Sequence, residues 1–104
     1  KIATIRQACA FHATAVLGAT QASVCAREVL RCLGGLELAA MVGAFIEAEQ
    51  HGVITVVDGF ISAVAALCAA RMQPSCRYNM VFSTALAEEP SSLRGGEILE
   101  AALG

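Results

Sequence analysis

The sequence predicts an α/β fold, in which a partial parallel sheet of two strands is flanked by buried helices. The first observation is an uninterrupted apolar run at residues 53–57 (VITVV), which stops at Asp58 and Gly59 and is typical of a strand buried on both faces. The second is the alanine-rich helical run that follows at once, because a strand feeding a helix is half of a parallel α/β unit. The third is a second apolar run, which predicts a strand over residues 78–83.

Two helices are predicted before residue 34. Residues 1–15 and 22–33 each carry apolar side chains every three to four positions, which indicates an inward face, and Ser23 is a candidate cap for the second helix. The side chains expected to face inward are Ile2, Ile5, Cys9 and a half-buried His12 in the first helix, and Val24, Cys25, Val29 and Cys32 in the second.

A third helix is predicted over residues 36–50, between two glycine signals. Its large apolar side chains point in several directions, so we expect burial over most of its surface. Four small residues provide a low-relief face for close packing, namely Ala39, Ala40, Gly43 and Ala44. His51 and Gly52 predict the end of this helix, with Gly52 in the left-handed conformation and His51 as a surface residue.

The rest of the chain predicts one more α/β unit. Residues 61–72 have no polar face before Arg71, so this helix is expected to be buried or to require a partner. Pro74 ends the helix, and the second strand follows. Residues 84–96 are polar and rich in turn residues, and a short helix is predicted over residues 97–103.

The junction after the first strand is the predicted functional site. Ligands of parallel α/β sheets bind beyond the carboxyl ends of the strands, where loops meet helix N-termini, and Asp58, Gly59 and Ser62 fall at that place. The alternative interpretation is structural: Asp58 caps the next helix and Gly59 makes the turn.

The composition predicts that the isolated chain exposes apolar surface. The 104 residues are 57% hydrophobic and 15% charged, against about 25% charged in an average domain, so we expect an exposed apolar patch. Two strands do not complete a doubly wound domain. Residues 1–104 are therefore interpreted as a single domain or an excerpt of a larger one, resembling a fragment of a Rossmann-like three-layer domain.

Charge and hydropathy exclude several classes of partner. The net charge of −2 without a basic cluster leaves no electrostatic footprint for nucleic acid. The best membrane candidate, residues 53–70, is interrupted by Asp58 and is near the minimum spanning length, so no membrane span is expected. The chain starts at Lys1 without a signal peptide or an initiator Met, which suggests a processed or excerpted cytoplasmic protein.

The five cysteines are odd in number and form no Cys-x-x-Cys motif. Reduced, mostly buried thiols are expected, and a zinc site with His12 and His51 is the alternative. These cysteines are Cys9, Cys25, Cys32, Cys68 and Cys76.

Two motifs resemble one enzyme family closely. Residues 34–44 are GGLELAAMVGA, and residues 57–62 are VDGFIS, followed by AAL at 65–67. Both segments resemble nicotinate-nucleotide–dimethylbenzimidazole phosphoribosyltransferases of the cobalamin pathway, which carry G-G-[FL]-E-[IL]-A-A-M-x-G-A and then D-G-F-I-x-x-x-A-A-L. The resemblance extends from Lys1, which matches the family's K-[IR]-A-x-[IV] segment, to the last residues, and it corresponds to a central-to-late portion of a full-length member.

The resemblance implies a reaction and a set of binding residues. Family members transfer the phosphoribosyl group of nicotinate mononucleotide to 5,6-dimethylbenzimidazole, usually as homodimers on a parallel α/β sheet, without a redox cofactor. Lys1 would hold a carboxylate or phosphate, Asp58 a ribose hydroxyl or the loop itself, and the glycines would let the backbone approach the ligand. The substrate-binding residues implied are Lys1, Gly34, Gly35, Asp58, Gly59, Ser62, Ser83 and Glu88.

The sequence departs from the family after the second strand. Where the family has S-H-R-S-A-E-P-G-H, residues 83–91 are STALAEEPS, so both histidines, the arginine and the second serine are missing. The glycine-rich loop with the catalytic glutamate is also missing; Glu88 is the nearest substitute, although it also fits a solvated loop carboxylate.

Three hypotheses follow from this comparison. The first is a fragment, or truncated member, of the family that lacks the catalytic base. The second is a non-catalytic binding or assembly module on the same fold. The third is an unrelated small helical oligomer.

Overall fold

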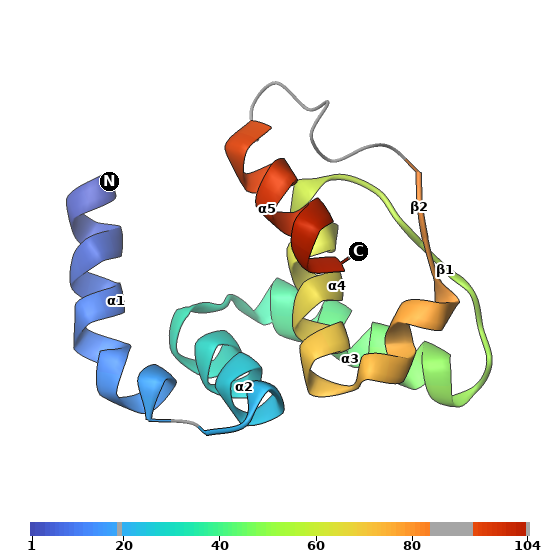
Figure 1. The fold of residues 1–104 in the computed structure, drawn as a ribbon, viewed down its shortest axis with the longest axis horizontal. Coiled ribbons are helices and arrows are strands. Elements are labelled where there is room, and N and C mark those ends of the chain that lie inside the picture. The colour runs from blue at the N-terminus through green and yellow to red at the C-terminus, as the bar shows by residue number, and fades with distance from the viewer. Residues whose placement is uncertain (19, 84–92, 104) are drawn as a thin grey trace.

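The computed structural model describes residues 1–18, 20–83 and 93–103, and it shows a mostly helical α/β arrangement (Figure 1). The predicted combination of several helices with two strands is confirmed. In chain order the elements are α1 (Ile2–Leu17), α2 (Ala22–Leu33), α3 (Leu36–Gln50), β1 (Thr55–Val57), α4 (Phe60–Met72), the 3₁₀ helix η1 (Pro74–Asn79), β2 (Met80–Phe82) and α5 (Leu93–Leu103).

The two strands pair in parallel, as the strand–helix–strand order predicts. Thr55 pairs with Met80, Val56 with Val81, and Val57 with Phe82. The register is also held at the amino ends of the strands, where the Thr55 hydroxyl donates to the carbonyl oxygen of Asn79 at 3.2 Å. The helix between the strands therefore connects two parallel neighbours, which places both carboxyl ends at one edge.

The prediction of a first strand buried on both faces is wrong. Val57 is 1% exposed, whereas Val56 and its cross-strand neighbour Val81 are 67% and 52% exposed. Val53 and Ile54 lie before the strand and are also exposed. Among the described residues α4 packs on one side of β1, so alternate side chains stay open on the other. This apolar row matches the exposed apolar surface that the composition predicts.

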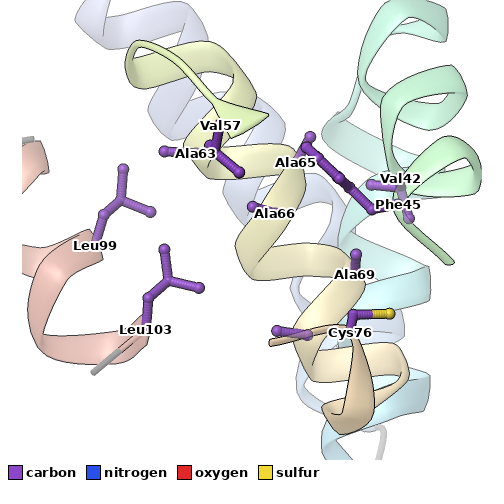
Figure 2. Close-up of a cluster of buried hydrophobic side chains, with 11 residues drawn as sticks. Val42, Phe45, Val57, Ala63, Ala65, Ala66, Ala69, Cys76, Leu99 and Leu103 are labelled. Carbon is purple, nitrogen blue, oxygen red and sulfur yellow. The ribbon is translucent and has the colours of Figure 1, made fainter. Parts of the chain in front are cut away.

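Helix α4 is the centre of the core, as its lack of a polar face predicts. It contacts α2, α3, α5, η1 and β1. Figure 2 shows α4 between α3, whose Val42 and Phe45 lie near Ala65, and α5, whose Leu99 and Leu103 point toward α4. The buried side chains of α4 are all alanines: Ala63, Ala65, Ala66, Ala69 and Ala70. Because alanine adds one methyl group, neighbouring backbones approach α4 closely.

Helix α3 buries one face, not most of its surface as predicted. Val42 and Phe45 are buried, and Leu38, Met41 and Ile46 pack partly buried against the same core. The small residues face outward instead: Ala39, Ala40, Gly43 and Ala44 are exposed. The expectation failed because these residues have so little side chain that periodicity alone cannot assign them to either face.

The helix end at His51 and Gly52 is confirmed. Gly52 has φ 67°, and the next amide, of Val53, donates to the carbonyl oxygen of Ala48 at 2.8 Å, which is the hydrogen bond of a Schellman motif. The His51 ring lies at the surface, where its Nε2 is 2.9 Å from the Glu47 carboxylate.

The inward face predicted for α1 is mostly wrong. Ile2, Ile5 and Cys9 are exposed, whereas His12 is partly buried as expected. Helix α1 packs against α2, and its amino-terminal half stands away from the other helices in Figure 1. The apolar stripe is therefore present in the sequence but is not covered by any described element.

Helix α2 has the predicted bounds but not the predicted cap. The N-cap residue is Gln21, without a side-chain cap hydrogen bond, so Ser23 does not serve this role. Val24 is also exposed rather than inward.

The second half of the chain contains two further differences. Residues 74–79 form η1, so the predicted strand 78–83 shortens to β2 and Tyr78 is exposed. Helix α5 begins at Leu93 rather than at Glu97, so Gly95 belongs to a helix and not to a turn. A Cβ at Gly95 would lie 2.7 Å from the Phe60 ring, which explains why a glycine suits this contact between α5 and α4. Residues 84–92 lie outside the described residues.

No helix in the described ranges is long and apolar enough to cross a bilayer.

The packing of α4 predicts that a larger side chain at Ala66 destabilises the protein. Ala66 is 0% exposed, so Ala66→Leu forces three extra carbons into a filled core and should lower the free energy of unfolding by about 1–3 kcal/mol. Urea denaturation followed by circular dichroism measures this quantity. The matched control is Ala40→Leu, the same substitution on the exposed face of α3, for which a change within about 0.5 kcal/mol is expected. Equal effects of the two substitutions would contradict the central position of α4.

Candidate functional site

The hinge between β1 and α4 consists of Asp58 and Gly59. Gly59 has φ 83° and ψ 173°, a conformation that is essentially restricted to glycine, so the turn predicted at this residue is confirmed. Asp58 does not cap α4: the N-cap residue is Gly59, and no side chain caps this helix. The capping interpretation of Asp58 is therefore wrong, and its carboxylate is available for another partner.

That partner is Ser83, the first residue after β2. The Ser83 hydroxyl donates to Asp58 Oδ1 at 2.5 Å, a length typical of a charge-assisted O–H···O⁻ bond. The Ser83 backbone amide also donates to the carbonyl oxygen of Val57 at 3.1 Å. Two hydrogen bonds thus join the carboxyl ends of the parallel strands, and two residues 25 positions apart in the sequence meet at the edge where the fold predicts a ligand site.

Ser62 closes the hinge from the first turn of α4. Its hydroxyl lies within hydrogen-bond distance of two backbone carbonyl oxygens, that of Gly59 at 3.0 Å and that of Asp58. These contacts run back along the chain across three and four residues, so they hold the turn in the conformation that Gly59 adopts. In this structure Ser62 supports the hinge through its hydroxyl hydrogen, and its side chain is partly buried.

The hinge is accessible and carries one negative charge. Asp58 and Ser83 are both exposed, and the ion pairs found among the described residues involve Glu28 with Arg31 and Glu47 with His51, not Asp58. The backbone N–H groups in the first turn of a helix have no acceptor inside the helix. The hinge therefore combines carboxylate and hydroxyl oxygens with the amide donors at the start of α4.

The other predicted site residues are not brought to the hinge. Lys1 is exposed at the amino end of α1, which Figure 1 shows on the side of the molecule away from the strands. Gly34 and Gly35 join α2 to α3. A Cβ at Gly34 would lie 2.6 Å from the backbone carbonyl oxygen of Leu30, so the close approach of this residue to the last turn of α2, which it ends, explains this glycine. Glu88 lies outside the described residues.

The direct contact between Asp58 and Ser83 was not foreseen from the sequence. Both residues were candidates, one from the strand–helix junction and the other from the family motif, but neither signal gives the register between the strands. The pairing of Val57 with Phe82 places the residues that follow each strand next to each other. The sequence signal that could have found the contact is the position of Asp58 directly after the first predicted strand and of Ser83 at the end of the second.

The cysteines are more exposed than predicted. Cys76 is buried, Cys25, Cys32 and Cys68 are partly buried, and Cys9 is exposed. Burial raises the pKa of the Cys68 and Cys76 thiols, which favours the unreactive thiol form. Within the part of the chain that the structure describes, no three His, Cys, Asp or Glu side chains gather where they could bind a metal ion.

Comparisons with known proteins identify related sequences. A family model described as phosphoribosyltransferase matches residues 1–101. A Pseudomonas aeruginosa protein named nicotinate-nucleotide–dimethylbenzimidazole phosphoribosyltransferase is 46% identical over 88 residues, which are 85% of this chain and 23% of that protein. A protein of the same name from Pseudomonas fluorescens is 45% identical over 82 residues, which are 79% of this chain and 21% of that protein. Another from Pseudomonas putida is 54% identical over 56 residues, which are 54% of this chain and 16% of that protein. No solved structure matches the chain.

The chain thus spans about a quarter, or less, of the length of these relatives. The resemblance that the sequence motifs indicate is confirmed at the level of the family.

The hinge geometry predicts opposite effects of two glycine substitutions. At Gly59 an added Cβ meets no atom within 4 Å, so Gly59→Ala tests backbone strain alone and should destabilise the protein by about 1–3 kcal/mol. Gly43 lies inside α3 with equally open space, so the control Gly43→Ala should stabilise it by about 0.5–1 kcal/mol. The free energy of unfolding in urea checks both values. An unchanged stability of Gly59→Ala would show that the hinge does not require a positive φ.

Proposed function

We propose that this chain, which belongs to the phosphoribosyltransferase family, forms part of the substrate cleft of an enzyme that transfers a phosphoribosyl group from nicotinate mononucleotide to 5,6-dimethylbenzimidazole. In this proposal the 104 residues are an excerpt of a larger, Rossmann-like three-layer domain, and the reaction belongs to cobalamin biosynthesis in the cytoplasm. The fragment contributes binding groups, and the catalytic base comes from outside it.

One observation supports the proposal most strongly: Asp58 and Ser83 meet at the carboxyl ends of two parallel strands. This edge is where open α/β sheets bind ligands, and both residues lie in segments that resemble the family's motifs. The contact at 2.5 Å fixes one carboxylate oxygen and leaves the rest of the carboxylate exposed to a substrate. A glycosyl transfer needs such groups to orient the ribose ring while the bond to nicotinate breaks.

The remaining substrate-binding residues are assigned by resemblance to the family. Lys1 would hold a phosphate or carboxylate, Gly34 and Gly35 would line the cleft, and Glu88 would lie near the acceptor base. Lys1 and the hinge belong to different parts of this structure, so the proposal requires the longer family domain to bring the amino end of α1 to the substrate.

The proposed absence of the base explains why the isolated chain should be inactive. Family members use a glutamate in a glycine-rich loop as the general base, and no such loop occurs in the sequence. The glycine-containing segment at Gly95 forms helix α5 instead. The unprotonated ring nitrogen of the benzimidazole attacks the ribose, and without a base the proton on the other ring nitrogen has no acceptor in the transition state, which typically costs a factor of 10²–10⁴ in rate.

The proposed partners are a second copy of the chain or the remainder of a longer chain. Several large apolar side chains are exposed, including Ile2, Ile5 and Phe11 of α1 and the cross-strand pair Val56 and Val81. Such a surface is unusual for a monomer of this size. Covering it would bury the outer face of the sheet, which supports the proposal that the described elements belong to a thicker layered domain.

A non-catalytic binding or assembly module is the second candidate. The observation that favours it is the sequence of residues 84–91, which lacks both histidines and the arginine of the family segment. If each missing donor made a charged hydrogen bond, its loss costs about 1.5–3 kcal/mol of substrate binding.

The proposal predicts that the purified 104-residue chain forms no α-ribazole 5′-phosphate from nicotinate mononucleotide and dimethylbenzimidazole, because the base is missing. Chromatography with mass detection measures the product. The positive control is the Pseudomonas aeruginosa relative with residues 1–83 of this chain in place of its matching segment, which should retain activity. Turnover by the isolated chain, or a folded chimera without any activity, would contradict the proposal.

Extending the graft through residue 91 separates the two candidates. This longer chimera should lose at least tenfold in activity, since one charged hydrogen bond is worth about that factor or more. The substitutions Thr84→His, Ala85→Arg and Leu86→Ser should restore the activity if the chain is a damaged enzyme. Failure to restore it would favour the non-catalytic module.

A further inference from the structure

Helix α5 is fastened to the α/β unit at both of its ends. At its carboxyl end the Arg77 guanidinium donates to the backbone carbonyl oxygen of Leu103, a group that has no donor inside the helix. A cation at this end of a helix also interacts favourably with the helix dipole. Arg77 belongs to η1, shortly before β2 starts at Met80. This end of α5 is therefore joined to the chain that enters the second strand.

At its amino end α5 packs on the first residue of α4. A Cβ at Gly95 would lie 2.7 and 2.8 Å from Cε2 and Cζ of the Phe60 ring. The ring therefore fills the space that a larger residue at position 95 would occupy. Phe60 follows Gly59 directly and starts α4. The side chain that α5 holds is thus attached to the backbone of the hinge.

The part of α5 between these two contacts completes the core. Leu99 and Leu103 are 5% and 9% exposed, and Figure 2 shows both side chains pointing toward α4. Removal of α5 would expose both leucines and free the Phe60 ring in the same event. The start of α4 would then lose a packing partner at the residue where the hinge ends.

Two backbone hydrogen bonds report whether the hinge is closed. The Ser83 amide donates to the carbonyl oxygen of Val57 at 3.1 Å, and the Ala63 amide donates to that of Gly59 at 3.1 Å. The first bond joins the strand ends, and the second forms the first turn of α4. Both depend on the path of the chain through Gly59, which continues into the residue that α5 holds.

We propose that α5 controls the hinge: Phe60 is a positioning residue through which docked α5 keeps Asp58 beside Ser83, and undocking of α5 releases this contact. In this view α5 and the hinge form one cooperative unit, which opens more often than the whole protein unfolds. The coupling does not depend on the ligand that the hinge binds, so it goes beyond the proposed function. A ligand or partner that favours one state of α5 would favour the corresponding state of the hinge, and the reverse would hold by the same factor.

The first test is native-state hydrogen exchange of the 104-residue chain, which measures how often each amide opens. The hinge is represented by the amides of Ala63 and Ser83, and α5 by those of Leu99 and Leu103. These two sets should share one opening frequency. That frequency should be higher than the one at Phe45 of α3, whose buried ring belongs to the main core.

The second test loosens α5 at the end that lies away from the hinge. Arg77→Gln removes the charged hydrogen bond to Leu103, so the amides of α5 and of the hinge should both exchange about tenfold faster. The matched control is Arg71→Gln, which removes an exposed arginine from the last turn of α4. It should leave hinge exchange unchanged within about twofold.

The third test examines whether Phe60 carries the coupling. Gly95→Ala places a methyl group against the ring and should accelerate exchange at the hinge by about tenfold, as expected for overpacking. In a chain that also carries Phe60→Leu, the two ring atoms that meet the methyl group are absent. There Gly95→Ala should cause no further acceleration.

Three results would overturn the inference. The first is faster exchange in α5 but not at the hinge of Arg77→Gln, which would mean that the hinge opens independently. The second is exchange of both sets at the frequency of Phe45, which would mean that only global unfolding joins them. The third is an equal effect of Gly95→Ala with and without the Phe60 ring. The second result needs no variant, so the test does not depend on the folding of a substituted chain.

The outcome is separate from that of the proposed function. The chimera with residues 1–83 does not contain α5 of this chain, so its activity decides the transferase proposal without reference to this coupling. An inactive chimera together with shared exchange of α5 and the hinge would reject the transferase proposal and keep the coupling.

Discussion

The fold depends on the close packing of other elements around α4. Its inward positions are alanines, and four of them, Ala63, Ala65, Ala66 and Ala69, are 0% exposed. A helix with large side chains on every face would hold its neighbours further apart. With methyl groups at its fully buried positions, α4 accepts larger side chains from α3 and α5 on different sides, as Figure 2 shows. The larger side chains of α4, such as Val64 and Leu67, pack partly buried against the same core.

The position of α4 determines where the hinge lies. Because this helix starts directly after β1 and leads through η1 to β2, both strands run in the same direction and end at the same edge. Gly59 turns the chain into α4 without a Cβ, and the hydroxyl of Ser62 holds that turn. Asp58 is thereby released from capping and reaches Ser83. The backbone conformation of Gly59 and the contact between Asp58 and Ser83 both follow from the short connection between β1 and α4.

The sequence predicted the elements well where side-chain size and backbone signals agree. Helices α2 and α3 have the predicted bounds, Gly52 adopts the predicted left-handed conformation, and Gly59 makes the predicted turn. Burial was predicted less well, because it depends on neighbours that a pattern does not contain: Ile2 and Ile5 fit an inward stripe but no described element covers them. Alanine and glycine in α3 fit either face. Gly95 signals a turn in the sequence, yet it serves a helix that packs on Phe60.

The site was also predictable only in part, because some of its contacts depend on neighbours that a sequence pattern does not contain. Asp58, Gly59 and Ser62 are neighbours in sequence, so the strand–helix junction identified them. Ser83 joined them only through the strand register, which follows from tertiary packing. Lys1 was assigned by resemblance alone, and its place at the amino end of α1, away from the hinge, is a property of the whole molecule that no local pattern contains.

A double-mutant cycle with Asp58→Ala and Ser83→Ala tests the central claim most directly, namely that the two strand ends form one site. The free energies of unfolding of both single variants and of the double variant give the coupling between the side chains. If the strand ends form one site, the double variant should be less destabilised than the sum of the single variants by about 1 kcal/mol, as expected for one exposed hydrogen bond to a carboxylate. Additive effects, within about 0.3 kcal/mol, would contradict it.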